Sequence, residues 1–299
     1  EANRQRKNYL NVYAKSFNWA GFFLPKNTYE ECAKLYAFCR VLDDIVDTDQ
    51  KLDIKKKDYE EIYNIFKLED ELKAKFEERY TFNQEAIIVS DMLAIAKNNK
   101  IKRVVINDLV EGVGSDLKEE IDFNSVKELL VYSYKVAGSV GLMMAKILNV
   151  NDTRSLKGAI DLGIAMQLTN IARDVIEDKK LNRRYIKSDF ENIKATLKLA
   201  EMFYESSFTS IKNIPFKFRF AIIVARRIYR QIGRKILQKK NMENYEKSGK
   251  IYLNNFEKIY HTIISIFDLI FISLKKVEPH QRSKEHAIIS QEVNLDERI

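Results

Sequence analysis

The stretch AMQLTNIARDVIED, residues 165–178, decides how the rest of the chain is interpreted. Asn170, Asp174 and Asp178 recur every fourth residue, so in a helix their side chains share one face. Carboxylates at this spacing repel one another, and the repulsion costs stability unless a cation or a hydrogen-bond donor lies between them. The stretch therefore predicts a helix whose acidic face binds a positive group, with Gln167 close to that face.

A second acidic row lies in YAFCRVLDDIVD, residues 36–47. Tyr36, Arg40, Asp43 and Asp47 are three or four residues apart, which indicates one stripe of another helix. Two such rows far apart in the sequence suggest one shared site for a hard divalent cation. Mg²⁺ suits it, because this ion prefers oxygen ligands and is commonly shared with phosphate oxygens. The alternative is two solvated helix faces, which explains one row more easily than both.

The composition favours an all-α fold. The chain has 299 residues, of which 45% are hydrophobic, with only three prolines and nine glycines. Long periodic stretches with few breaking residues are typical of helices joined by short loops, so we expect one helical domain over residues 1–278. Residues 279–299 are polar and lack clear periodicity, which predicts a mobile tail.

The formal charge of +8 is compatible with several kinds of anionic partner. Lysine is spread along the chain rather than gathered in a basic motif, so we expect no nucleic-acid partner, whereas an anionic membrane or a polyanionic substrate fits the charge. No signal peptide is apparent, which favours the cytoplasm. The apolar run at residues 263–274 is shorter than the roughly 20 residues that cross a bilayer. We interpret it as a core helix, with peripheral contact at the inner face of the membrane as the alternative.

Small residues cluster in YSYKVAGSVG, residues 132–141. Gly138 and Gly141 fall inside a predicted helix, where each glycine costs roughly 1 kcal/mol relative to alanine. Either another helix crosses closely there, or the missing side chains leave room for a long apolar ligand. Tyr132 and Tyr134 precede the patch and could line the mouth of such a cavity.

A basic loop follows the first acidic row. Arg183, Arg184 and Tyr185 could fold over an anionic ligand bound by metal, although a solvated basic loop explains them equally well. All three histidines lie near the C-terminus of the sequence. This position argues against a histidine-ligated metal site organised with the acidic rows.

At these motifs the chain resembles the squalene and phytoene synthase family, and most of all its bacterial phytoene synthases. The matching stretches are SFNWAGFFLP (16–25), YAFCRVLDDIVD (36–47), YKVAGSVG (134–141), MQLTNIARDVIED (166–178) and RRYI (183–186). The resemblance implies a single-domain isoprenoid synthase helical bundle around a central cavity. It also implies a prenyltransferase of carotenoid biosynthesis.

The resemblance assigns the candidate site residues as well. It implies that Mg²⁺, or Mn²⁺ in its place, is held by Asp43, Asp47, Asn170, Asp174 and Asp178. It implies catalytic roles for Asp43, Asp47, Asp174, Asp178, Tyr132 and Tyr134. It implies contacts to diphosphate or to the pocket from Ser16, Tyr36, Arg40, Gln167, Asn170, Arg173, Arg183, Arg184, Tyr185 and Tyr229. Lys250 and Lys258 match the family more loosely, as further basic contacts.

The implied reaction is head-to-head condensation of two geranylgeranyl diphosphates to phytoene through prephytoene diphosphate. A related alternative starts from farnesyl diphosphate and gives squalene, dehydrosqualene or presqualene diphosphate. The chain lacks a nicotinamide-binding fingerprint, which mildly disfavours reductive squalene formation. Two other classes stay open: a non-catalytic relative that keeps the fold as an assembly protein, and a basic helical protein that binds nucleic acid.

Overall fold

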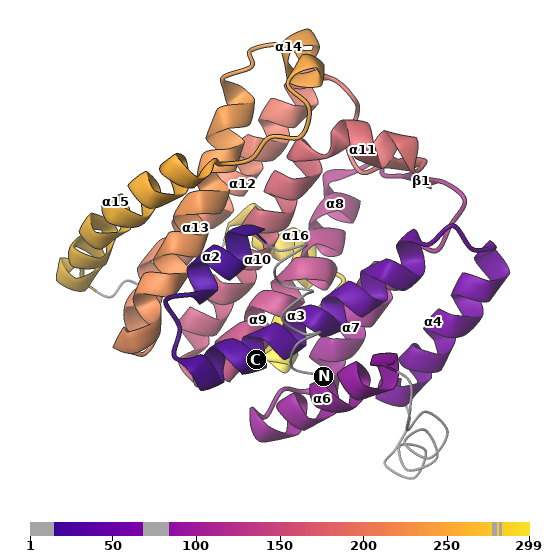
Figure 1. Ribbon diagram of the computed structural model, residues 1–299, viewed down its shortest axis with the longest axis horizontal. Helices are drawn as coiled ribbons and strands as arrows, with labels where there is room; N and C mark the ends of the chain where they lie inside the picture. The colour runs from indigo at the N-terminus through magenta and orange to yellow at the C-terminus, as the bar shows by residue number, and fades with distance from the viewer. Residues whose placement is uncertain (1–14, 68–83, 277–279, 281–282) are drawn as a thin grey trace.

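The computed structural model describes residues 15–67, 84–276, 280 and 283–299, with the side chains of residues 15–17, 67 and 84–86 excepted. Within these ranges the chain is mostly helical with almost no sheet, and the helices pack side by side into one bundle (Figure 1). The prediction of an all-α helical bundle is confirmed.

The helices follow one another in two groups along the chain. The first group contains α2 (Lys15–Gly21), α3 (Lys26–Asp47), α4 (Leu52–Lys67), α6 (Gln84–Asn98), α7 (Arg103–Gly114), α8 (Val126–Ser133), the π-helix η1 (Tyr134–Gly138) and α9 (Ser139–Ile147). The second group contains α10 (Thr153–Arg173), α11 (Val175–Lys180), α12 (Phe190–Ser210), the 3₁₀ turn η2 (Ile211–Asn213), α13 (Phe216–Leu237), α14 (Met242–Lys247), α15 (Asn255–Leu274), α16 (Lys284–Ser290) and α17 (Leu295–Arg298). Two-residue strands, β1 (Ile121–Asp122) and β2 (Arg183–Arg184), pair in parallel.

The central helix is α10, which packs against η1, α9, α12 and α13 (Figure 1). Its start is fixed by the Asp152 side chain, which accepts a hydrogen bond from the Ser155 backbone N–H at 3.0 Å and so satisfies a donor that the first turn leaves free. Ile160, Ile164 and Leu168 are buried along its length. A helix held on several sides is a rigid support for the polar residues near its C-terminal end.

The acidic row 165–178 is not the one uninterrupted helix that its spacing predicts. Asp174 leaves helical geometry, with φ −105° and ψ 14°, and separates α10 from α11. The backbone hydrogen bonds nevertheless continue across the break, because Asp174 N–H bonds to the Asn170 carbonyl at 2.9 Å and Asp178 N–H bonds to the Asp174 carbonyl at 2.8 Å. The three side chains therefore still lie along one side.

The small-residue patch marks a close helix crossing rather than room for an apolar ligand. A Cβ atom added to Gly141 would lie 2.2 Å from the Ala159 carbonyl oxygen, and one added to Gly163 would lie 2.2 Å from the Ala137 carbonyl oxygen. Both neighbours are backbone atoms, which cannot move aside as a flexible side chain can. The backbones of α10 and of η1–α9 thus approach closely because both helices carry glycine at the crossing.

Gly163→Ala is expected to lower the free energy of unfolding by about 3 kcal/mol, because α10 must move away from η1 to admit the methyl group. For a chain of this size the melting temperature should fall by roughly 5–10 °C. Gly233→Ala on α13 is the matched control, since its added Cβ would meet only side-chain atoms, the nearest at 3.1 Å. Thermal unfolding followed by circular dichroism measures both, and equal melting temperatures would contradict the close crossing.

The buried apolar side chains form two large clusters that touch. The first includes residues of α3, α4 and α6–α9, the second includes residues of the segment before α15, and α10, α12 and α13 contribute to both. Ile186 and Tyr229 pack against both clusters. The two clusters therefore act as one continuous core rather than as the cores of separate units.

The expected mobile tail is wrong for the described part of residues 279–299. There the chain forms α16 and α17, and Ile289, Val293 and Leu295 are buried in the first apolar cluster. The Arg298 guanidinium donates to buried Asp108 at 3.0 Å. Short helices and a weak apolar period concealed this packing, because its partners lie far away in the sequence.

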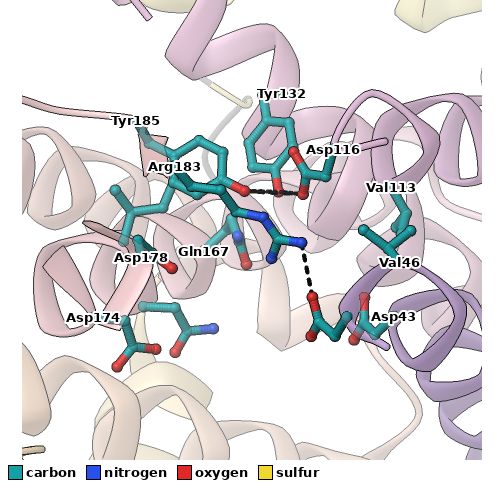
Figure 2. Close-up of a pocket in the computed structure, with 13 residues that line it drawn as sticks. Asp43, Val46, Val113, Asp116, Tyr132, Gln167, Asp174, Asp178, Arg183 and Tyr185 are labelled. Carbon is teal, nitrogen blue, oxygen red and sulfur yellow. Dashed lines mark hydrogen bonds and ion pairs between the residues drawn. The ribbon is translucent and has the colours of Figure 1, made fainter. Parts of the chain in front are cut away.

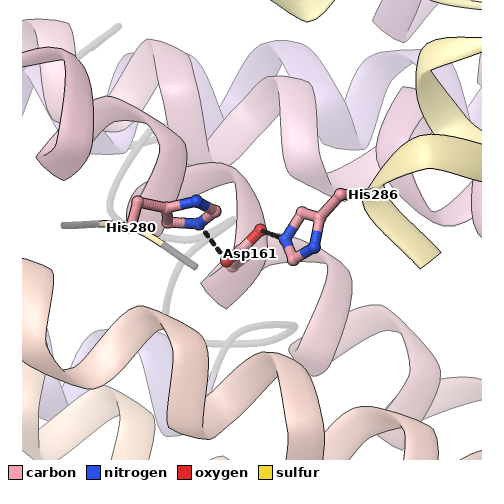
Figure 3. Close-up of side chains that lie close together, drawn as sticks. All are labelled: Asp161, His280 and His286. Carbon is pink, nitrogen blue, oxygen red and sulfur yellow. Dashed lines mark hydrogen bonds and ion pairs between the residues drawn. The ribbon is translucent and has the colours of Figure 1, made fainter. Parts of the chain in front are cut away.

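Two of the histidines fix this C-terminal segment. His280 Nε2 lies 2.7 Å and His286 Nε2 lies 2.9 Å from the two carboxylate oxygens of Asp161, which is buried on α10 (Figure 3). Burial opposes ionisation of Asp161, but these hydrogen bonds outweigh it and lower the pKa of the carboxyl.

Asp161, His280 and His286 lie close enough together to bind a metal ion, but the hydrogen bonds of His286 argue against a metal site. The Ser283 backbone N–H donates to His286 Nδ1 at 3.0 Å. This nitrogen is therefore unprotonated, so the proton of the neutral ring is on Nε2, where it is donated to Asp161. A ring nitrogen that carries a proton has no lone pair for a metal. The cluster is a hydrogen-bonded anchor for the C-terminal segment.

Candidate active site

The two acidic rows face one cavity of about 160 Å³ (Figure 2). Asp43 and Asp47 of α3 line it together with Asn170, Asp174 and Asp178 of the α10–α11 stretch. Figure 2 shows Asp43 across the cavity from Asp174 and Asp178. The cavity is lined by Asp43, Val46, Asp47, Val113, Asp116, Tyr132, Gln167, Asn170, Ile171, Asp174, Asp178, Arg183 and Tyr185. Pockets for small molecules usually measure roughly 300–1,000 Å³, so this polar space suits charged head groups better than long apolar chains.

The carboxylates of the two rows are crowded. Burial raises the pKa of Asp178 to about 7, and the nearby charge of Asp174 adds to the rise while Arg183 opposes it. Partial burial likewise raises the pKa of Asp43 to about 7, with Arg40 opposing and Asp47 contributing. Groups of like charge held together in this way are stabilised by a cation placed between them.

Basic side chains contact both rows. Arg183 extends from β2 across the cavity to Asp47, at 2.8 Å (Figure 2). On the other side, Asp174 pairs with Arg173 at 2.6 Å and with Lys250 at 3.1 Å. Arg40 pairs with Asp44, one residue beyond Asp43. Arg183 thus lines the cavity among its carboxylates, and the other cations pair with carboxylates at its edge, an arrangement that can hold divalent cations and a phosphate group together.

Asn170 gives independent support for a bound cation. Its Oδ1 atom is buried and has no hydrogen-bond partner among the described residues, and the residue lines the cavity between the carboxylates. An unsatisfied buried oxygen is costly, and a bound ion is one of the explanations for it. Together with four carboxylates it forms an all-oxygen donor set, which fits Mg²⁺ or Mn²⁺.

An aromatic cluster closes one end of the cavity. The rings of Tyr132 and Tyr185 stack with their centroids 4.8 Å apart, and Phe123 packs edge-on against both. Asp116 Oδ2 accepts hydrogen bonds from the Tyr132 hydroxyl at 2.7 Å and from the Tyr185 hydroxyl at 2.9 Å (Figure 2). Burial and the Asp116 charge raise the pKa of both phenols well above the usual range, so both remain protonated and act as donors.

Sequence reasoning missed two members of this cluster, Asp116 and Phe123. Asp116 follows the glycines of α7 in EGVGSDL and belongs to no periodic row, and Phe123 lies in the connection that contains β1. The isolated aspartate after a glycine-rich helix end was the available signal. Lys250, which matched the family loosely, is placed at the site by its ion pair with Asp174.

Most of the residues proposed from the sequence are brought together. Those that line the cavity are Asp43, Asp47, Tyr132, Gln167, Asn170, Asp174, Asp178, Arg183 and Tyr185. Those that lie next to its lining are Tyr36, Arg40, Arg173 and Tyr229, which interact electrostatically with one another or with the acidic rows. The side chain of Ser16 lies outside the described part of α2.

Three candidates are not brought into the cavity. Tyr134 is fully buried and donates a hydrogen bond to Asp108 at 2.8 Å, away from Tyr132 and the acidic rows. Arg184 points out of the cavity and pairs with Asp122, because alternate residues of a strand face opposite sides and Arg183 takes the inner side. Lys258 is buried beside the ring of Trp19, 5.7 Å from its centroid.

Comparison with known proteins agrees with this geometry. A family model described as squalene/phytoene synthase matches residues 10–190. The 15-cis-phytoene synthase of Enterobacter agglomerans is 31% identical over 250 residues, covering 77% of this chain and 84% of that protein. The 15-cis-phytoene synthase of Paracoccus sp. (strain N81106 / MBIC 01143) is 32% identical over 250 residues, covering 75% and 78%.

Solved structures show the same fold. A dehydrosqualene synthase in complex with ligand has a TM-score of 0.65 at 24% identity, covering 91% of this chain and all of that one. A squalene synthase from Alicyclobacillus acidocaldarius has a TM-score of 0.62 at 16% identity, covering 82% and 94%. Because the family model matches more than half of its length and relatives above 30% identity cover most of it, the chain belongs to the squalene/phytoene synthase family.

Proposed function

We propose that this protein condenses two geranylgeranyl diphosphates head to head to phytoene, through prephytoene diphosphate. The observation that carries the proposal is the pair of oxygen-rich rows from α3 and α10–α11 that face each other across one cavity. Curated relatives that are named phytoene synthases support the choice of substrate. Condensation of farnesyl diphosphate to squalene, dehydrosqualene or presqualene diphosphate is the second candidate, which the names of the solved structures favour.

The residues that would hold the divalent metal are Asp43, Asp47, Asn170, Asp174 and Asp178. When bound, Mg²⁺ or Mn²⁺ neutralises the diphosphate leaving group and so lowers the barrier to allylic ionisation. The chain supplies the remaining positive charge, because Arg183, Arg173 and Lys250 already contact the carboxylates of the cavity. These cations would shift from carboxylate to diphosphate oxygens as the substrate binds.

The allylic cation that follows ionisation needs aromatic faces and protection from water. Tyr132 and Tyr185 place aromatic rings in the lining at one end of the cavity, with Phe123 packed behind them, and a cation is attracted to an aromatic ring. Their rigid packing, fixed by Asp116, would also exclude water that could capture the cation. The released diphosphate can take up the proton, so the site needs no dedicated protein base.

The deciding experiment is incubation of the protein with geranylgeranyl or farnesyl diphosphate and Mg²⁺, with the products identified by mass. A C40 hydrocarbon from the first substrate is expected. Removal of the metal by EDTA should abolish turnover, and Mg²⁺ or Mn²⁺ should restore it. Condensed products from farnesyl diphosphate alone would favour the second candidate, and the absence of any condensed product would contradict both.

Arg183→Gln is expected to raise the KM for the diphosphate substrate about tenfold or more, because a charge-assisted contact inside the cavity is lost. Arg184→Gln is the matched control, since its guanidinium lies outside the cavity and pairs with Asp122. Steady-state kinetics of the two variants measure the difference. Equal effects at the two positions would contradict the assigned roles.

We further propose that the enzyme works in the cytoplasm, in peripheral contact with the inner face of the membrane. Its substrates would be lipids with a charged head group, which partition into bilayers. None of the described helices combines the length and apolarity that a membrane crossing requires. Any contact made by these helices would therefore be with the membrane surface.

A further inference from the structure

The helix α15 turns its polar side toward the protein. Asp268 accepts two hydrogen bonds from Arg227 of α13, at 2.6 and 2.7 Å. Thr262 accepts a hydrogen bond from the Trp19 indole at 2.9 Å, and Lys258 is only 7% exposed. The polar residues of this helix are thus used for packing against α2 and α13.

The opposite side, which we call the outer face of α15, is apolar and points to solvent. Every exposed residue of the helix except Asn255 and Ser273 is aliphatic or aromatic, and none is charged. The exposed fraction reaches 87% at Phe256, 67% at Phe267 and 81% at Leu274. In a helix that folds to cover a core, the apolar side is expected to be the buried one. The arrangement in α15 is the reverse.

The outer face is continuous and long. A helix of 20 residues spans about 30 Å, and α15 lies at the edge of the bundle with α13 beside it (Figure 1). Exposed apolar patches of this extent mark sites that contact another molecule or a membrane. Because no described helix is suited to crossing a bilayer, the geometry is that of a helix lying along an apolar boundary.

The charge around the outer face indicates its partner. Lys275 and Lys276 follow the helix directly, and the antiparallel neighbour α13 starts nearby with exposed Phe216 and Lys217. The Lys212 ammonium contacts the Lys275 carbonyl oxygen, which places these two ends together. The sequence from residue 206 to residue 242 contains no Asp or Glu. An apolar stripe that ends in a group of cations complements a bilayer that contains anionic lipids.

A second copy of the chain fits this surface less well. Across all of α15, which the structure describes completely, the exposed residues include no carboxylate that could pair with the lysines of a second copy. The face is also one convex helix rather than a groove. A stable protein interface usually buries roughly 800 Å² on each partner with close complementarity.

We propose that the outer face of α15 docks on the surface of a bilayer containing anionic lipids, with the cations at its C-terminal end against the head groups. This surface is directly connected to the site. Lys250, which pairs with Asp174, and Tyr252, whose ring lies 5.4 Å from the Arg173 guanidinium, come just before α15 in the chain. The docked helix would hold the cavity close to the membrane. That the substrates lie in this membrane rests on the proposed function.

Flotation with vesicles tests the docking. The full chain is mixed with vesicles of phosphatidylcholine and phosphatidylglycerol in equal parts, or of phosphatidylcholine alone. The test variant is Ile263→Gln with Phe267→Gln and Ile270→Gln, and the control is Ile54→Gln with Ile87→Gln, which removes exposed isoleucines of α4 and α6. The test variant should bind the mixed vesicles about 100-fold more weakly, and the control should bind unchanged.

A second variant tests the cations at the end of the helix. Lys275→Glu with Lys276→Glu should weaken binding to the mixed vesicles about tenfold or more, with a smaller effect on binding to the neutral vesicles.

Two further measurements separate the outcomes. The test variant should keep its melting temperature, because the replaced side chains are exposed, so weaker binding cannot be attributed to unfolding. Equal vesicle binding by test variant and unaltered protein would overturn the proposal. Light scattering that shows a dimer of the unaltered protein and a monomer of the variant would also overturn it, in favour of a second copy. Turnover is measured separately with detergent-dispersed geranylgeranyl diphosphate, so that a failure of the proposed chemistry leaves the vesicle result interpretable.

Discussion

Asp178→Asn is expected to lower kcat by about 1,000-fold, because it removes one oxygen ligand from the row that would hold the metal against the leaving group. Asp178 lines the cavity from α11, and its pKa is raised to about 7 by burial and by the nearby charge of Asp174. The neutral amide keeps the size of the side chain but binds a divalent cation weakly. Single-turnover kinetics at saturating Mg²⁺ measure the loss.

The matched control for this variant is Glu177→Gln. Glu177 precedes Asp178 in the same short helix but does not line the cavity, so its turnover should stay close to that of the unaltered enzyme. Without metal, Asp178→Asn should melt at the same temperature as the unaltered protein or higher, since a repelled buried charge has been removed. If both the melting temperature and the activity of Asp178→Asn fell, the result would instead indicate that Asp178 has a structural role.

Asp116→Asn is expected to lower kcat by about 100-fold with little change in KM. Asp116 accepts hydrogen bonds from the hydroxyls of Tyr132 and Tyr185, and its other oxygen, Oδ1, is buried without a partner among the described residues. The carboxylate orients both rings and places negative charge at the lining of the cavity. An amide retains the shape but removes that charge.

Asp122→Asn serves as its control, because Asp122 lies in the same connection but is paired with Arg184 outside the cavity. Turnover of the Asp116 and Asp122 variants is compared at saturating substrate. Full activity in Asp116→Asn would show that turnover does not depend on the negative charge of Asp116.

Much of the site was predictable because it is encoded in local spacing. Asn170, Asp174 and Asp178 share a face as their four-residue period required, and the break at Asp174 did not disturb this because the backbone hydrogen bonds continue through it. Asp43 and Asp47 follow the same rule on α3. Helical period alone could not show that the two rows meet; the shared preference of such carboxylates for a divalent cation suggested it, and the resemblance to a family added support.

The predictions for individual side chains were wrong where the direction of a side chain depends on local backbone geometry that the helical repeat does not reveal. Tyr132 and Tyr134 are two residues apart and looked equivalent, but the chain passes from α8 into the π-helix η1 between them, and they point to different aspartates. Arg183 and Arg184 were expected in a loop, but they form a two-residue strand, so their side chains point to opposite faces of that strand. Asp116 was missed because its partners come from distant parts of the chain.

The anchor formed by Asp161, His280 and His286 has a consequence for the order in which the protein can be completed. His286 is synthesised 125 residues after Asp161. Until His286 has been synthesised, Asp161 on the middle helix lacks both histidine partners, and the apolar surface that Ile289 and Leu295 will cover is open. The nascent bundle should accordingly stay sensitive to proteolysis until α16 and α17 have been synthesised and have packed onto it.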